Sequence, residues 1–293
     1  KITAGGICGS DLHYWRGEFK PFYQGEGPAV TGHEMTGVVA QLGPGVSTDS
    51  AGQPLKEGDK VVFAYFNPCG RCPICLRGEL GECPRKFQYR YTVELYPYCH
   101  GGFADYYYLR PGTFVFKAPK DLPDEALAPV NCALCQVIYG LDRAGFRIGD
   151  TLVVQGAGGL GLYACAVAKE AGARTVIAID GVPARLQLAR QCGADHTINI
   201  NEVREAKDRV ARVLEWTNGV GTDVVMELVG TPAVIPEGIE MLRQGGAYVE
   251  IGTITPTAAV SLQIAGLNRK GARFFGLFNY HPRILPLALD FLS

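Results

Sequence analysis

One short stretch of the chain carries four cysteines whose spacing suits a metal ion. Cys69, Cys72, Cys75 and Cys83 follow the pattern C-x2-C-x2-C-x7-C. Two-residue gaps let a turn present neighbouring thiolates to one ion, and the longer gap closes a tetrahedron of sulfurs with no open position. The spacing therefore predicts a structural zinc site in a lobe at about residues 67–84. An iron–sulfur cluster is the chemical alternative, since ferredoxin-like runs also use C-x2-C-x2-C, but the seven-residue gap favours zinc.

A second group of metal-binding residue types is spread along the chain. Cys8 lies in Cys-Gly-Ser-Asp-Leu-His, and His33 lies in Gly-His-Glu. Thiolate and imidazole both suit zinc, and a catalytic zinc needs three protein ligands and one position open for water or substrate. The third candidate is Cys132, in Ala-Pro-Val-Asn-Cys, and Cys135 is an alternative that the chemistry alone leaves open.

A glycine-rich turn predicts a dinucleotide site. The apolar run 152–155 leads directly into Gly-Ala-Gly-Gly-Leu-Gly, which then opens a helix, so G-x-G-x-x-G stands in the setting that it requires. The first glycine permits the tight turn, the second lets the backbone approach a pyrophosphate, and the third allows close helix packing. The helix N-terminus supplies N–H groups for the phosphates. The predicted cofactor-binding residues of the turn are Gly156, Gly158, Gly159, Leu160 and Gly161.

The kind of dinucleotide follows from the next predicted strand. That strand ends at Asp180, 19 positions past Gly161 and close to the ~20 expected for the acidic residue that binds the ribose. A carboxylate there accepts both ribose hydroxyls and repels a 2′-phosphate, and Gly181 and Val182 bring no cation next to it. We predict NAD rather than NADP, with Asp180 and Arg185 as further cofactor-binding residues.

The elements that must position these residues change in character near residue 130. Before it, short β-type runs alternate with turn signals, which predicts a mainly antiparallel sheet or partial barrel. These runs are 36–41, 60–64 and 104–109. After it, apolar strands alternate with amphipathic helical segments, which predicts a doubly wound parallel sheet of six strands in the order 3-2-1-4-5-6. The strands are 152–155, 175–179, 196–199, 223–229, 247–251 and 273–278, and the helical segments are 160–171, 183–192 and 201–217.

Taken in order, these motifs resemble those of the zinc-containing medium-chain alcohol dehydrogenases, over nearly the whole chain. The resemblance implies an α/β fold with a mainly β, GroES-like catalytic domain over residues 1–132 and a NAD-binding Rossmann domain over 133–276. Residues 277–293 would begin the return to the catalytic domain. Members of this family extend beyond both Lys1 and Ser293, so we expect a chain that is truncated at both ends.

The resemblance also implies a catalytic metal centre. Cys8, His33 and Cys132 would bind the catalytic zinc. Glu34 would be the neighbouring carboxylate that takes the open position in some resting forms. Asp11 would orient His33 through its other ring nitrogen.

A proton path is implied in the same way. Ser10 would accept the proton of the bound hydroxyl and pass it, by the cofactor ribose, to His13 at the surface. The alternative is that Ser10 caps a helix that starts at Asp11, with His13 as a solvated residue. The expected reaction is oxidation of an alcohol to an aldehyde or ketone by hydride transfer from a zinc-bound alkoxide to NAD, with two zinc ions per chain.

Other functions remain as alternatives. A polyol or amino-alcohol dehydrogenase of the sorbitol or threonine type shares these motifs. A zinc-free reductase of the same fold is a further alternative. A non-catalytic nucleotide-binding protein would more often lack Cys8, His33 or Ser10. We expect a small-molecule alcohol or polyol as substrate and a homodimer or homotetramer. Phe22, Tyr23 and Tyr91 are candidates for a substrate pocket, with ordinary packing as the alternative.

Composition argues against several classes of protein. The net charge is −1 without a basic run, which disfavours a nucleic-acid surface. No apolar run reaches the ~18 residues that a membrane span needs, and the start of the chain has no apolar signal-peptide segment. Clustered cysteines in a chain this long bind metal more often than they form disulfides, so we expect a reducing cytoplasm. Of the cysteines without a role, Cys99, Cys135, Cys165 and Cys192, we expect Cys165 and Cys192 in the core.

Overall fold

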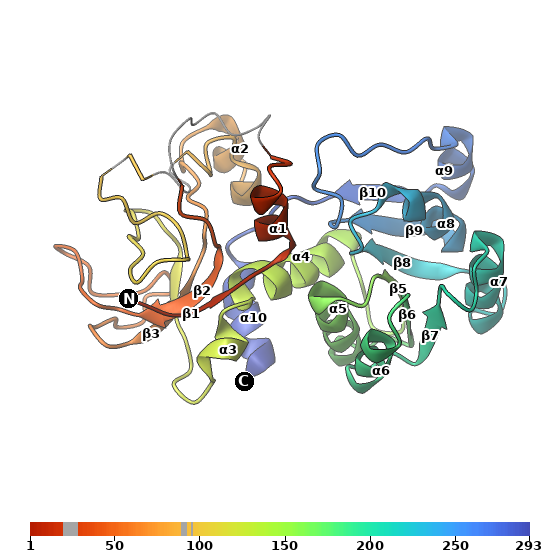
Figure 1. Ribbon diagram of the computed structural model, residues 1–293, viewed down its shortest axis with the longest axis horizontal. Coiled ribbons are helices and arrows are strands. Elements are labelled where there is room, and N and C mark those ends of the chain that lie inside the picture. The colour runs from red at the N-terminus through yellow and green to blue at the C-terminus, as the bar shows by residue number, and fades with distance from the viewer. Residues whose placement is uncertain (20–28, 89–92, 95) are drawn as a thin grey trace. The chain divides into compact units, whose positions relative to one another are not determined.

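The computed structural model describes residues 1–19, 29–88, 93–94 and 96–293, which form two compact units (Figure 1). One unit comprises Lys1–Cys135 together with Asn279–Ser293, and the other comprises Gln136–Phe278. The three aromatic residues predicted for a substrate pocket, Phe22, Tyr23 and Tyr91, lie outside the described residues. Within the described ranges no helix combines the length and the apolar character needed to cross a membrane.

The first unit is built on a four-stranded antiparallel sheet, as its alternation of short runs and turns predicts. Its strands, in spatial order, are β1 (Ile2–Gly6), β2 (Glu34–Val38), β3 (Lys60–Phe63) and β4 (Val115–Lys117). The predicted strand 104–109 is wrong. The backbone of this segment makes isolated hydrogen bonds to other segments, from the Ile2 N–H to the Asp105 carbonyl and from the Tyr108 N–H to the Cys99 carbonyl. It therefore forms no β-ladder.

Short helices complete the first unit. They are α1 (Gly9–Trp15), α2 (Pro73–Leu76), the 3-10 turn η2 (Leu80–Glu82), α3 (Asp124–Leu127), the π-helix η3 (Val130–Leu134) and α10 (Ile284–Leu292). The N-cap of α1 is Cys8, whose backbone N–H donates to Asp11 at 2.9 Å. Capping by Ser10 is therefore wrong, because α1 already begins at Gly9. The helix α4 (Cys135–Ala144) follows η3 directly.

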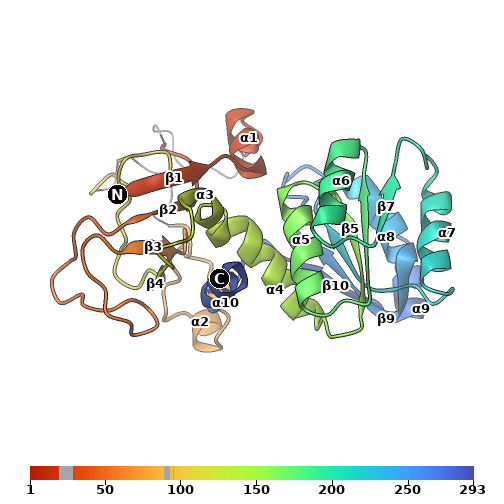
Figure 2. The same cartoon turned by 90° about the horizontal axis from the view of Figure 1, so that it is seen from below.

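The second unit is a doubly wound α/β domain, and its predicted strand order is confirmed. Six parallel strands lie in the order β10-β9-β8-β5-β6-β7, with helices on both sides (Figure 2). The strands are β5 (Thr151–Gln155), β6 (Thr175–Asp180), β7 (His196–Asn199), β8 (Thr222–Glu227), β9 (Leu242–Glu250) and β10 (Arg273–Gly276). The helices are α5 (Gly159–Glu170), α6 (Pro183–Gln191), α7 (Ala206–Trp216), the 3-10 turn η4 (Pro232–Val234), α8 (Ile235–Met241) and α9 (Ile264–Lys270).

The core of the second unit explains why its strands are nearly continuous apolar runs. Every residue of β5 is buried, as expected for a central parallel strand covered on both faces. Val153 lies in register with Ile177 on β6 and with Val225 on β8, and all three belong to one buried cluster. This packing fixes the position of the strand ends, where the glycine turn begins.

Candidate active site

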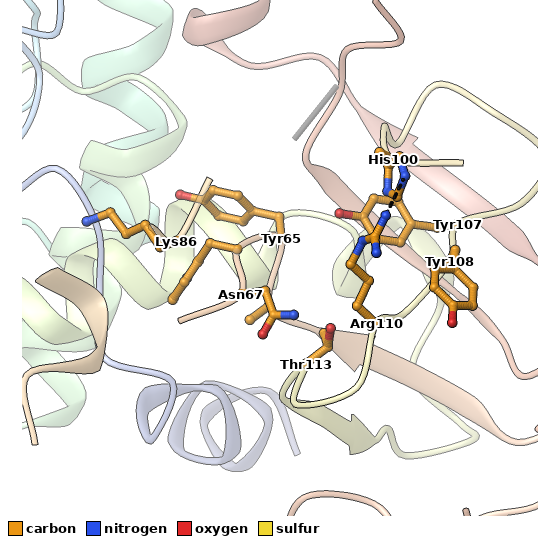
Figure 3. A pocket seen from close by; sticks show the side chains of 10 residues that line it. Tyr65, Asn67, Lys86, His100, Tyr107, Tyr108, Arg110 and Thr113 are labelled. Carbon is orange, nitrogen blue, oxygen red and sulfur yellow. Dashed lines mark hydrogen bonds between the residues drawn. The ribbon is translucent and has the colours of Figure 1, made fainter. Parts of the chain in front are cut away.

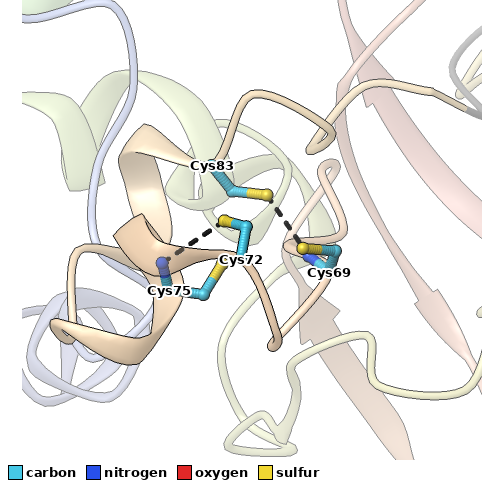
Figure 4. Close-up of side chains that lie close together, drawn as sticks. All are labelled: Cys69, Cys72, Cys75 and Cys83. Atoms are coloured by element: carbon cyan, nitrogen blue, oxygen red, sulfur yellow. Dashed lines mark hydrogen bonds between the residues drawn. The ribbon is translucent and has the colours of Figure 1, made fainter.

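The four cysteines of the lobe converge on one point, as their spacing predicts (Figure 4). The sulfurs of Cys69, Cys72, Cys75 and Cys83 all lie within 4.8 Å of one another. A tetrahedral zinc ion with Zn–S bonds of ~2.3 Å would place its sulfurs about 3.8 Å apart, so the arrangement fits one such ion. All ten cysteines of the chain lie in the described ranges and are free, so disulfides do not compete for these sulfurs.

Local structure directs these thiols inward. Cys72 is the N-cap of α2, and its sulfur accepts the Cys75 N–H at 3.4 Å, while Cys83 accepts the Cys69 N–H at 3.3 Å. The backbone N–H of Arg71 lowers the pKa of Cys69 to about 6, which favours a thiolate at neutral pH. Burial instead raises the pKa of Cys75 to about 12, so a cation is needed to hold all four sulfurs as thiolates.

The second metal-binding group is brought together from distant parts of the first unit. The sulfur of Cys8 lies 3.6 Å from His33 Nε2, and the sulfur of Cys132 lies 3.3 Å from the same nitrogen. Cys8 caps α1, His33 immediately precedes β2, and Cys132 lies in the π-helix η3, a kind of irregularity often found at functional sites. Two thiols and an imidazole around one point are a donor set that fits a zinc ion with one open position.

Two buried carboxyl groups border this donor set. Burial raises the pKa of Glu34 to about 7, partly offset by a hydrogen bond with Cys132. The pKa of the Cys132 thiol also lies well above its usual range, because of a hydrogen bond with Cys8, burial and the charge of Glu34. Asp11 lies within 4.8 Å of Cys8 and His33, and its oxygen Oδ1 is buried without a hydrogen-bond partner among the described residues. A cation between these groups would relieve each of these costs.

The position of Cys132 depends on side chains from far along the chain. Asn131 donates from Nδ2 to the Phe63 carbonyl at 3.0 Å, and the hydroxyl of Tyr280 donates to the Asn131 carbonyl at 2.6 Å. Cys135, the alternative third ligand, is fully buried, and burial holds its pKa well above the usual range. Its thiol contacts Tyr280. The geometry therefore places Cys132 at His33 and Cys135 against the return segment.

The residues expected to carry the proton lie on α1. Ser10 is half-buried in the first turn, and His13 is half-buried in the last turn. Nδ1 of His13 is hydrogen-bonded to Glu18, and its ring lies 5.6 Å from that of Phe19. An imidazole beside a carboxylate is suited to hold or release a proton. Glu18 follows α1 and belongs to no recognisable motif, so the sequence alone does not mark it as a functional residue.

The glycine turn has the shape that a pyrophosphate site needs. Gly156 has φ +96°, a conformation that favours glycine, and a Cβ on Gly161 would lie 1.9 Å from the Gly156 carbonyl oxygen. Gly158 and Gly159 instead face open space, since a Cβ at either would meet nothing within 4 Å. The helix α5 begins at Gly159, so its free N–H groups point into that space.

Asp180 lies at the end of β6 beside this turn. Its carboxylate accepts the Ala157 N–H and the Val182 N–H, both at 2.8 Å, which orients it toward the glycine loop. Arg185 Nη1 lies 3.7 Å from Asp180 Oδ2. Arg185, in the first turn of α6, is therefore paired with the Asp180 carboxylate.

The first unit also contains a small hollow (Figure 3). Tyr65, whose ring centroid is 4.7 Å from that of His33, lines it together with His100 and Arg110. Arg110 Nη2 donates to His100 Nε2 at 3.2 Å. The cavity volume is about 30 Å³, which suits a water molecule but not a substrate, since ligand pockets span ~300–1,000 Å³. Tyr65 and Tyr280 were missed by the sequence analysis, because neither stands in a motif.

The chain is similar to known proteins over most of its length. Two family models match most of the chain: an alcohol dehydrogenase GroES-like domain over residues 1–120 and a zinc-binding dehydrogenase over residues 159–293. A 5-exo-hydroxycamphor dehydrogenase of Pseudomonas putida is 37% identical over 283 residues, which cover 94% of this chain and 76% of that protein.

Two further proteins are similar over almost the whole chain. The sorbitol dehydrogenase of Bacillus subtilis (strain 168) is 33% identical over 293 residues, which cover 100% of this chain and 78% of that protein. An alcohol dehydrogenase of Thermotoga maritima has a solved structure that matches with a TM-score of 0.89 at 31% identity. That match covers 99% of this chain and 80% of the other.

Proposed function

The chain belongs to the family of zinc-containing medium-chain alcohol dehydrogenases, and on that premise we propose that it oxidises an alcohol or polyol to an aldehyde or ketone with NAD. As a member it is an oxidoreductase that uses zinc and a nicotinamide cofactor. The observation that carries the proposal is the approach of Cys8 and Cys132 to one nitrogen of His33, with the buried Glu34 beside them.

The metal-binding and proton-carrying residues of the first unit have separate roles in this proposal. When bound, zinc supplies a positive charge that acidifies a substrate hydroxyl, and the nicotinamide supplies an acceptor for hydride. Cys8, His33 and Cys132 hold the catalytic ion. Ser10 takes the hydroxyl proton, and His13, steadied by Glu18, releases it to solvent.

The second unit provides the dinucleotide site in this proposal. The turn from Gly156 to Gly161 takes the pyrophosphate at the start of α5, and Asp180 accepts the ribose hydroxyls. We propose NAD rather than NADP because the carboxylate of Asp180 would repel a 2′-phosphate. Arg185 binds the cofactor from the same edge.

The four-cysteine lobe holds a second, structural zinc, so we propose two ions per chain. We also propose the division into a catalytic domain, residues 1–132, a NAD-binding domain, residues 133–276, and a return segment, residues 277–293. A homodimer or homotetramer is proposed because β10 is an edge strand of its sheet. The free cysteines support a reducing compartment, the cytoplasm.

The polyol alternative has its own support, since one relative is named a sorbitol dehydrogenase. Elemental analysis and a substrate panel test both. We expect two zinc ions per chain and reduction of NAD in preference to NADP with at least one simple alcohol, polyol or amino alcohol. One ion per chain would mean an empty reacting centre, and none would refute the proposal. Protein stripped by a chelator and reloaded with zinc is the control.

A further inference from the structure

The last residues of three neighbouring strands form a polar row in the second unit. Gln155 ends β5, Glu227 ends β8 and Glu250 ends β9, and the register places Glu227 directly between the other two. Residues paired in register point to the same face of a sheet. Two acidic side chains therefore stand side by side, with Glu227 fully buried and Glu250 half-buried.

Accounting for hydrogen bonds leaves one oxygen of each acid without a backbone donor. Glu227 Oε1 accepts the N–H groups of Val229 and Gly230, both at 2.7 Å, and Glu250 Oε1 accepts the Thr253 N–H at 2.8 Å. Among the described residues, no lysine or arginine pairs with either acid, and Glu227 Oε2 and Glu250 Oε2 are buried without a backbone N–H donor. The Thr253 hydroxyl is the neutral polar group beside Glu250. Two adjacent carboxylates in that setting cannot both be charged without a large cost.

The surroundings of the pair favour one retained proton. Burial, a hydrogen bond with Glu227 and the charge of Glu227, in that order, raise the pKa of Glu250 to about 8, partly offset by hydrogen bonds from the backbone and side chain of Thr253. The titratable groups nearby are Tyr248 on β9 and Glu237 on α8, and neither adds positive charge. Arg209 of α7 forms an ion pair with Glu237 and not with either acid of the pair. Lys270 of α9 donates to the Glu240 carbonyl of α8 and to the Leu242 carbonyl, which lies at the opposite end of β9 from Glu250. The neighbouring positions on β5 and β10 are the neutral residues Gln155 and Gly276.

The pair ties two loops to the end of the sheet. A Cβ on Gly252 would lie 2.5 Å from Glu227 Oε2 and 2.6 Å from the Gly230 nitrogen, so the loops 228–230 and 251–253 touch there. The Gly252 N–H also donates to the Glu227 carbonyl at 3.1 Å. Val229 in turn packs against Gly156, where an added Cβ would lie 2.9 Å from it. Carboxyl ends of strands at the point where strand order reverses, here β5 and β8, are where such sheets bind ligands.

We propose that Glu227 and Glu250 share a single proton and act as positioning residues, holding the loops 228–230 and 251–253 in the arrangement that binds the dinucleotide. This inference rests on the proposed function, because it takes the dinucleotide as the ligand. It adds a proton-coupled element to a site otherwise defined by the glycine turn and Asp180.

The direction of the coupling follows from charge. A bound dinucleotide brings negative phosphates to this edge and excludes water from it, and both effects favour the protonated pair. The complex therefore holds the proton more tightly than the free protein. The affinity for the dinucleotide is highest below about pH 7 and falls as the pH rises through the Glu250 pKa of about 8. Above that pH both carboxylates are charged, and their mutual repulsion loosens the two loops.

Fluorescence titration of the zinc-loaded protein with NADH measures this coupling. Between about pH 6.5 and about pH 9.5 we expect the wild-type Kd to rise roughly tenfold, the effect of one unit of pKa difference between free and bound protein. In Glu250→Gln the amide donates to Glu227 without titrating, so its Kd stays level. Glu240→Gln, an exposed acid on α8, is the matched control and keeps the wild-type slope.

Hydrogen exchange of the Gly230 and Thr253 amides gives a second measurement that needs no ligand. Corrected for intrinsic rates, exchange accelerates above about pH 8 in the wild type but not in Glu250→Gln. Glu227→Gln, which keeps an acceptor for the loop amides, gives the same flat profiles if Glu250→Gln fails to fold. The shared proton is contradicted if the Kd for NADH depends on pH in either glutamine variant, or if it does not depend on pH in the wild type. Absence of NADH binding at every pH refutes the proposed function. The hydrogen-exchange data then show by themselves whether Glu227 and Glu250 share a proton.

Discussion

The two cysteine-rich groups of the first unit reach similar geometries by different routes. The lobe draws its four sulfurs from one short segment, Cys69 to Cys83, in which turns and the cap of α2 do the positioning. The donor set at His33 instead joins Cys8 and Cys132, which lie 25 and 99 residues from His33 along the chain. The lobe can form its site locally, whereas the donor set needs the sheet, the π-helix and Tyr280 in place first. We therefore expect the lobe to stabilise the unit around it, and the donor set to depend on the rest of the unit for its geometry.

The largest effect is expected from breaking the lobe. Cys83→Ala removes a fully buried sulfur, and structural zinc sites in small domains contribute about 10–16 kcal/mol of apparent binding energy. We expect loss of one zinc and a Tm lower by at least about 10 °C, measured by calorimetry with metal analysis. Cys99→Ala, in the same unit but in neither group, should leave both values unchanged. An unaltered Tm in Cys83→Ala would show that the lobe is not a structural site.

Breaking the donor set should affect chemistry rather than folding. Cys132→Ala removes one zinc and lowers kcat by at least about 10³-fold, since the bound ion contributes several kcal/mol to charge stabilisation. Its Tm should fall much less than that of Cys83→Ala. Cys135→Ala is the matched control and retains both zinc ions and turnover. The opposite pattern, with zinc lost only in Cys135→Ala, would assign the wrong third ligand.

A smaller effect is expected from the proton path, which leaves both metal sites intact. Ser10→Ala removes the hydroxyl that takes the substrate proton and lowers kcat by roughly 10²-fold, the lower end for general acid–base groups. Both zinc ions and the Tm should stay as in the wild type. Ser10→Thr, which keeps a hydroxyl, should recover much of the turnover. Unchanged kcat in Ser10→Ala would remove Ser10 from the path.

Much of the fold was predictable because it rests on local patterns. The alternation of buried strands and amphipathic helices predicted the six parallel strands and their order, which the structure confirms. The prediction of a strand at 104–109 was wrong because this tyrosine-rich run has the residue pattern of a strand but pairs with no neighbouring strand. The strands β1 and β4 were not predicted because they are short. They are recognisable as strands only from their pairing with β2 and β3.

The sites divide along the same line. Close spacing in the chain was enough to predict the four-cysteine lobe and the glycine turn, since neighbouring residues stay near one another whatever the rest of the fold does. Glu18 and Arg185 are also close in the chain to their partners His13 and Asp180, but they belong to no motif that marks such a contact. Long-range packing brought Cys132 to His33, and strand register brought Glu250 to Glu227, because contacts between distant residues depend on the tertiary structure.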